Sequence, residues 1–154
     1  MKTKNLLSIL LIVVTTTAFS QINFDLKTSN VKWTGKKITN QAHSGSIKFS
    51  SASLSLDNPN NPLGVFTVDM TSLTNEDLTG EWKQKLEGHL KSDDFFSVKK
   101  YPKATLIIKK INSHNNNTYE VTGNLTIKNR THPVNFSLVV YKDRVESKLT
   151  FDRT

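Results

Sequence analysis

The side chains best suited to chemistry in this sequence are His43, His89, His114, His132, Asp93 and Asp94. No two histidines have the short spacing of a metal site, and the sequence contains no Cys, so neither a metal site nor a cysteine nucleophile is predicted. The Gly-x-Ser-x-Gly turn of many serine hydrolases does not occur either. Neighbouring residues of a strand point to opposite faces, so the two adjacent acids are not expected to form a catalytic pair. These residues therefore do not by themselves indicate a catalytic site.

The charge pattern argues against a nucleic-acid partner. The chain carries 21 Lys and Arg against 13 Asp and Glu, a net charge of +8. These basic residues lie singly or in pairs, without the interleaved aromatic residues of a single-strand binder. A glycine-rich phosphate loop is also missing from the sequence. The positive charge fits a solvated face or an anionic envelope surface.

The first twenty residues have the organisation of a cleavable secretory signal. A basic start is followed by an apolar stretch over residues 6–14 and then by the small residues Ala18 and Ser20. We predict a signal peptide over residues 1–20, cleavage near Ser20/Gln21, and a periplasmic or secreted protein.

The remaining residues, 21–154, are predicted to form one domain, because their number matches the usual size of a single domain. Apolar and polar residues alternate with a period of two over 31–35, 66–70, 119–127 and 134–140. This alternation is typical of strands with one apolar face. Short antiparallel strands of this kind form a sandwich or a closed barrel, and the period does not choose between them.

One segment departs from the period of two. The residues that recur there at helical spacing are Leu78, Trp82, Leu86, His89 and Leu90. Thr74 and Asp77 have the spacing of a capping box. The pattern predicts a helix at about 75–91 that covers one edge or one mouth of the sheet.

Phe95 and Phe96 follow this predicted helix directly. Two aromatic rings at a junction between helix and strand can belong to the core, or they can form a gate over a cavity. Both interpretations stay open at this point.

The run over residues 86–98, LEGHLKSDDFFSV, followed by Tyr101-Pro102-Lys103-Ala104, resembles the signature of YceI-like polyisoprenoid-binding proteins. Supporting motifs occur in matching order at residues 33–35, 43–45, 68–73, 123–127, 131–134 and 151–153. The resemblance implies an all-β fold, an extended lipocalin-like antiparallel β-barrel with one inserted helix. It implies an exported protein that binds a long isoprenoid or similar amphiphile, for example a prenyl quinone, without catalysis. The family continues by roughly a further hairpin, so we expect the final hairpin to be missing from this chain.

The predicted ligand is held by apolar side chains, since each buried methylene contributes about 0.8 kcal/mol. The residues predicted to line the site are Trp33, Phe66, Val68, Met70, Leu90, Phe95, Phe96, Val121, Leu125, Phe136 and Leu138. The predicted polar contacts are His43, His89 and Arg153. No cofactor other than this lipid is expected.

Two other functions are compatible with the same residues. One is a hydrolase or isomerase that acts on an amphiphile in the same cavity and uses a titrating histidine. The other is a secreted structural or adhesion domain whose core is filled. Transient contact with a membrane surface and formation of a homodimer are also compatible with the sequence.

Overall fold

The computed structural model describes residues 21–36, 41–57 and 62–152. The predicted signal peptide and Arg153 lie outside these residues. The described strands are β1 (Asn30–Lys36), β2 (Ala42–Leu54), β3 (Gly64–Asn75), β4 (Lys103–Asn115), β5 (Thr118–Ile127), β6 (Arg130–Val140) and β7 (Val145–Lys148). A helix, α1 (Gly80–Lys91), lies between β3 and β4.

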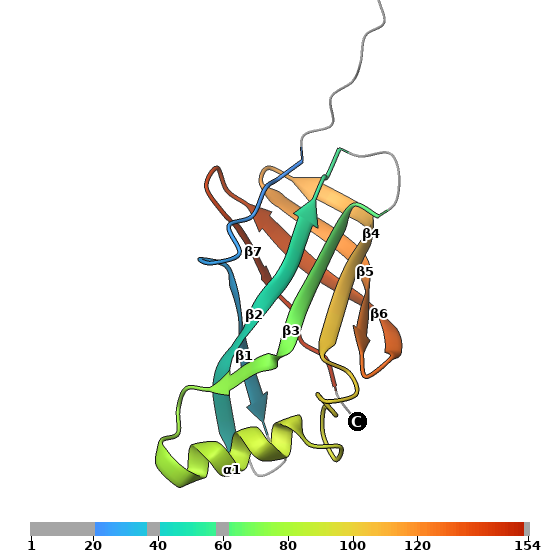
Figure 1. Cartoon of the computed structure of the whole chain (residues 1–154). Coiled ribbons are helices and arrows are strands. Elements are labelled where there is room, and N and C mark those ends of the chain that lie inside the picture. Colours follow the sequence, from blue (N-terminus) through green and yellow to red (C-terminus); the bar gives the residue numbers. More distant parts are fainter. Residues whose placement is uncertain (1–20, 37–40, 58–61, 153–154) are drawn as a thin grey trace, which may run out of the picture.

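The seven strands form a single sheet in which each strand pairs with the next along the chain. Every pairing is antiparallel, from β1 with β2 through to β6 with β7. The sheet curls into a half-barrel, and α1 lies across its lower end (Figure 1). One continuous curled sheet excludes the sandwich for the described residues. The prediction of an all-β, lipocalin-like fold is confirmed.

Irregular pairing in the long strands accompanies the curl. The register of β2 against β3 shifts between Ser46 and Lys48 and again between Phe49 and Ser51. The pairing of β4 with β5 shifts after Ile108 and after Ile111. Bulges bend a strand and increase its twist, so these positions allow long strands to follow a curved surface.

The apolar face of the sheet points into the curl, as the alternation predicts. On β5, for example, Val121 and Gly123 are buried whereas Glu120 is exposed. The buried apolar residues form two clusters, one beside α1 and one toward the opposite end of the sheet. α1 contributes Leu86 and Leu90 to the first cluster. No helix in the described part of the chain is long and apolar enough to cross a membrane.

The helix begins at Gly80 rather than at residue 75, and the predicted capping box does not form. Asn75 is the last residue of β3 and is completely buried. Thr79 takes the N-cap position without a side-chain hydrogen bond. The Thr74 hydroxyl donates instead to the Glu87 carboxylate at 2.7 Å. Thr74 and Asn75 thus pair with β2 as part of strand β3, so the helix begins after them and Thr74 does not cap it.

Trp82 also differs from the helical pattern, because its side chain is not part of the buried stripe. It is 71% exposed, whereas Leu90 is 8% exposed. Trp82 and Leu90 lie eight positions apart, about 80° around the helix axis, which is enough to place them on different faces.

Two glycines provide a matched test of this packing. A Cβ at Gly45 would overlap the Thr74 carbonyl and lie 2.7 Å from the Trp33 ring, whereas a Cβ at Gly88 would have no atom within 4 Å. We expect Gly45→Ala to lower the free energy of unfolding by about 1–3 kcal/mol. Gly88→Ala should raise it by up to about 1 kcal/mol, because alanine is the better helix former. Urea unfolding measures the free energy of unfolding of both variants. Equal changes in the two variants would contradict the close packing of Gly45 against Trp33 and Thr74.

Candidate ligand-binding site

The inner surface beside α1 is the first part of the candidate site. Its buried residues are Ile47, Met70, Leu73, Leu90, Val98 and Ala104. The half-buried side chains packed against them include Trp33, Val68, Phe95 and Phe96. Six of the predicted lining residues therefore meet at one end of the half-barrel, although they come from β1, β3, α1 and the segment after α1.

The second cluster occupies the other half of the inner surface. Its buried residues are Leu54, Ile108, Val121, Phe136 and Leu138, and Phe66 packs against them. Phe66 also contacts the ring of Phe24, with ring centroids 5.6 Å apart. Leu125 is half-buried on β5, on the same side of the strand as Val121. Whether any of these residues contacts a ligand stays a prediction.

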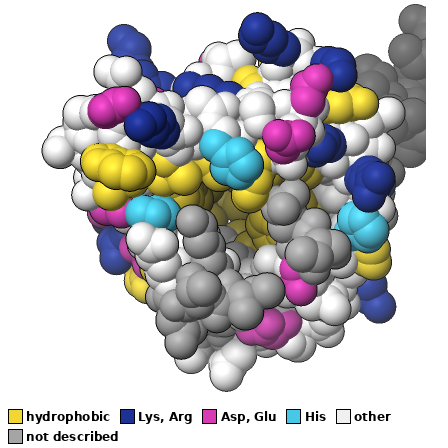
Figure 2. All heavy atoms as spheres, turned by 90° about the horizontal axis from the view of Figure 1, so that it is seen from below, with side chains coloured by type: hydrophobic (Ala, Val, Ile, Leu, Met, Phe, Trp, Pro, Cys, Tyr) yellow, Lys and Arg dark blue, Asp and Glu magenta, His cyan; other side chains and the backbone are white. Residues whose placement is uncertain are grey.

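The end of the half-barrel beside α1 is hollowed. Seen from below, hydrophobic side chains lie deep in a recess, and charged and histidine side chains lie around its rim (Figure 2). An apolar recess with a polar rim suits a ligand with a long apolar part and a small polar head.

Phe95 and Phe96 are held beside this recess by a tight turn. Their rings meet edge to face with centroids 4.6 Å apart. The Phe96 amide donates to the Leu90 carbonyl, and the Val98 amide donates to the Lys91 carbonyl. Ser97 has a φ of 49°, and its hydroxyl donates to the Asp93 carboxylate at 2.8 Å. Both rings are half-buried, which leaves the core and gate interpretations open.

His43 is the predicted polar contact that the structure holds most firmly. It lies on β2, two positions before Gly45 and therefore on the same face of the strand. Its Nδ1 lies 2.8 Å from a carboxylate oxygen of Asp77. The other oxygen of Asp77 accepts the Ser44 amide at 2.7 Å. These two contacts fix the orientation of the imidazole at the α1 end of the sheet.

His89 occupies a different environment. It is exposed near the end of α1, and its ring lies 5.8 Å from the ring of Phe95. This aromatic contact links His89 to Phe95, which packs against the first cluster. The predicted role of His89 in ligand binding stays a prediction.

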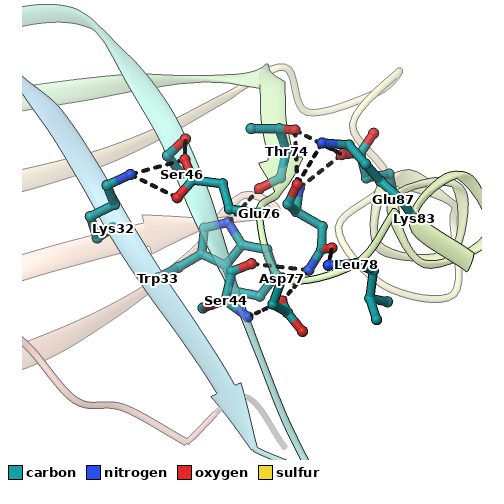
Figure 3. A network of polar contacts seen from close by, with 11 residues as sticks. Lys32, Trp33, Ser44, Ser46, Thr74, Glu76, Asp77, Leu78, Lys83 and Glu87 are labelled. Atoms are coloured by element: carbon teal, nitrogen blue, oxygen red, sulfur yellow. Dashed lines mark hydrogen bonds and ion pairs between the residues drawn. The ribbon is translucent and has the colours of Figure 1, made fainter. Parts of the chain in front are cut away.

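Asn75 is a central residue of the site that sequence reasoning missed. Its partners Ser44, Asp77 and Leu78 are labelled in the network of polar contacts that Figure 3 shows. The side-chain amide of Asn75 donates to the Ser44 carbonyl and to Asp77, and its side-chain oxygen accepts the Leu78 amide. Its backbone amide donates to the Glu87 carboxylate, and its carbonyl accepts the Lys83 ammonium at 2.6 Å. This one residue joins β2, β3 and α1. Asparagine in a turn-like sequence gives no signal for burial, so the sequence could not reveal it.

A tryptophan completes the same junction. The indole nitrogen of Trp33 donates to the Thr74 carbonyl at 3.2 Å. Gly45, directly opposite Trp33 in the β1–β2 register, leaves room for the ring. The predicted lining residue Trp33 therefore also fixes the corner where α1 meets the sheet.

Metal chemistry has no support in this region. Among the described residues, no group of three or more His, Asp and Glu side chains is arranged to hold a metal ion.

Comparison with known proteins identifies the family of this chain. The family model described as the YceI-like domain matches residues 22–154. The chain belongs to the YceI-like family. This is a family of binding proteins for hydrophobic ligands and is not known as an enzyme family. The resemblance in the sequence is thereby confirmed.

The chain is also similar to several individual proteins. The structure of BcnA from Burkholderia cenocepacia is 30% identical, with a TM-score of 0.61 over 78% of this chain and 72% of that one. The YCEI protein of Campylobacter jejuni is 20% identical, with a TM-score of 0.44 over 90% of this chain and 68% of that one. UPF0312 proteins of Pseudomonas putida are 44% identical over 48 residues, which span 31% of this chain but only 25% of those relatives.

We expect replacement of Asn75 by Ala to destabilise the protein by about 2–4 kcal/mol, because it removes the hydrogen bonds that this completely buried side chain makes to Ser44, Asp77 and Leu78. Asn112→Ala is the matched control. The side chain of Asn112 is exposed, and its hydrogen bond among the described residues is to the Thr122 hydroxyl. Removing this side chain should therefore lower the free energy of unfolding by about 0.5 kcal/mol or less. Chemical denaturation measures both variants. Equal losses would show that Asn75 is not the hub of the junction.

The junction also predicts how stability depends on pH. The Ser44 amide, and secondarily His43, lower the pKa of Asp77 from 3.8 to about 2. Because this pKa is lowered on folding, its stabilising contribution is complete above the unfolded pKa and is lost as the pH falls from about 4 towards 2. Asp77→Asn should flatten the fall in melting temperature over that window. The exposed control Asp143→Asn should retain the wild-type profile, and a wild-type profile in Asp77→Asn would refute the assignment.

Proposed function

We propose that this protein is an exported, non-catalytic carrier that holds a long isoprenoid or similar amphiphile, for example a prenyl quinone, against the inner face of its curled sheet. The observation that carries the proposal is the apolar recess at the α1 end (Figure 2) in a chain that belongs to the YceI-like family. The two apolar clusters line the curl from one end to the other, which suits a ligand that is long rather than compact.

The energetics of such binding follow from the apolar lining. Each methylene removed from water contributes about 0.8 kcal/mol, so one isoprene unit contributes roughly 3 kcal/mol before ordering costs. Several units therefore outweigh the cost of ordering the tail. Polar residues at the mouth would select the head, and His43 is suited to this role because Asp77 orients its ring.

Export is the second part of the proposal and rests on the sequence of residues 1–20. The mass of the protein recovered from an exporting bacterial host tests it. Loss of these residues would leave Gln21 at the N terminus, whereas an intact chain in the cytoplasm would refute export.

The carrier function is tested by native mass spectrometry of the protein purified without detergent. We expect a co-purified lipid whose extracted mass identifies it. After lipid removal, prenyl quinones with longer tails should bind more tightly until the tail exceeds the length of the apolar surface. A protein that is empty and binds no prenyl quinone of any length would refute the carrier function.

An enzyme acting on an amphiphile is the second candidate, and the His43–Asp77 pair favours it because a carboxylate-oriented imidazole can serve as a general base. For a carrier, the lipid recovered after incubation keeps both its mass and its chromatographic retention time. A change in either that His43→Ala abolishes, while binding remains, would instead establish the enzyme, because hydrolysis changes the mass and isomerisation changes the retention time.

A further inference from the structure

The outer face of α1 carries an aromatic residue that its packing does not use. Trp82 is 71% exposed, the most exposed large hydrophobic side chain of the described residues. Lys85 lies over its ring, 5.1 Å from the centroid, and its ammonium also forms an ion pair with Glu81 at 2.9 Å. The opposite face of the helix is already occupied by the contacts of Leu86 and Leu90 with the first cluster. Tryptophan beside lysine on an exposed helix face is typical of contact with the headgroup layer of a membrane.

A groove lies along the other edge of the same exposed face. It has a volume of about 610 Å³ and is lined by Thr71, Gly88, Lys91, Ser92, Asp93, Val98 and Lys99. The Asp93 carboxylate is already bound by the Lys100 ammonium at 2.9 Å and by Ser97. Lys91 and Lys99 form no ion pair within the described residues. The groove therefore carries two lysines without an ion pair, although Lys91 lies close enough to Asp69 and Glu87 to contribute to lowering the pKa of both carboxylates.

Gly88 gives an independent indication that the groove is kept open. A Cβ at this position would meet no atom within 4 Å, so packing does not require glycine here. Glycine inside a helix costs about 0.5–1 kcal/mol relative to alanine. Gly88, which lines the groove, therefore makes α1 less stable than alanine would at the same position.

The arrangement of these groups fits a flat, extended partner. Trp82 and Lys91 are nine positions apart, about 13 Å along the axis and about 180° around it, so they mark the two edges of the exposed half of the helix, on which Lys85 and Gly88 also lie. Lys and Arg side chains also lie around the rim of the recess at this end (Figure 2). A surface that is broad, apolar below its headgroups and negatively charged matches all of these features.

We propose that the α1 end of the half-barrel docks on an anionic lipid bilayer, with Trp82 among the headgroups and lipid phosphates between Lys91 and Lys99. This contact would place the apolar recess against the membrane. The inference does not depend on which ligand the protein carries, since the docking groups lie on the outer surface. Its test therefore uses vesicles without isoprenoids and is separate from the test of the carrier function.

The experiment measures partition onto vesicles of phosphatidylcholine alone and with about one third phosphatidylglycerol. All variants are purified from the same exporting host, with their masses recorded so that every sample has the same N terminus. We expect binding only to the anionic vesicles and its loss at high salt, as screening requires. Lys91→Gln with Lys99→Gln should weaken it about 25-fold, at roughly fivefold for each lysine.

The matched control is Lys109→Gln with Lys110→Gln, which removes the same charge from β4 beside the second cluster. This control should remain within about twofold of the wild type. Equal weakening of both double variants would show attraction by net charge alone and would overturn the docking surface.

The aromatic contact has its own readout. Brominated lipids should quench the fluorescence of the wild type, and Trp82→Phe should lose that quenching while the signal of Trp33 remains. Absence of quenching in the wild type, or binding to neutral vesicles as strong as to anionic ones, would refute the proposal. Glycerol phosphate that occupies the groove while anionic vesicles do not bind would assign the groove to a soluble anion and would also refute it.

Discussion

The described structure depends on a sheet that has one apolar face and one polar face. A sheet of this kind leaves its apolar face in water unless it packs on another layer or curves around itself. Here the sheet curves, with the irregular pairing of β2 and β4 allowing the bend. The inner face then gathers side chains from distant segments into the two clusters, and the same curvature produces the recess at the end beside α1.

The position of α1 across that end creates a second requirement, because the corner where α1 meets β2 and β3 buries backbone groups as well as apolar side chains. Asn75 meets this requirement with its side chain and both of its backbone polar groups. Buried polar groups are costly unless they are bonded, so α1 can lie over the end only with its side chains in this register. The orientation of His43 follows from the same corner, since Asp77 is held by Ser44 and Asn75.

The inner and outer surfaces correspond to the two proposed tasks. The inner face suits an apolar tail, whereas the outer surface at the α1 end carries the exposed Trp82 and the groove lined by Lys91 and Lys99. A carrier of amphiphiles must exchange its cargo without exposing it to water. A docking surface at the open end of the apolar recess would shorten the distance that the tail travels between membrane and protein.

The strands and their inward faces could be predicted from the sequence, because a period of two records which side chains leave water. That period placed Val121, Phe136 and Met70 on the buried face, and the resemblance in residues 86–98 placed the chain in its family. Residues whose role depends on partners far along the chain left no such record. The spacing of Thr74 and Asp77 predicts a local helix cap, but their side chains bond to α1 and β2. The helical spacing predicts that Trp82 lies on the apolar face of the helix, but its side chain is exposed.

The sequence by itself therefore determined which side chains prefer to be buried and in what order the strands follow one another. Only the tertiary structure decided where the helix begins, how His43 is oriented and why Asn75 is buried. The physical reason is that hydrophobic preference belongs to each residue alone. Hydrogen bonding of a buried polar group depends instead on the distance and direction of partners that folding brings together.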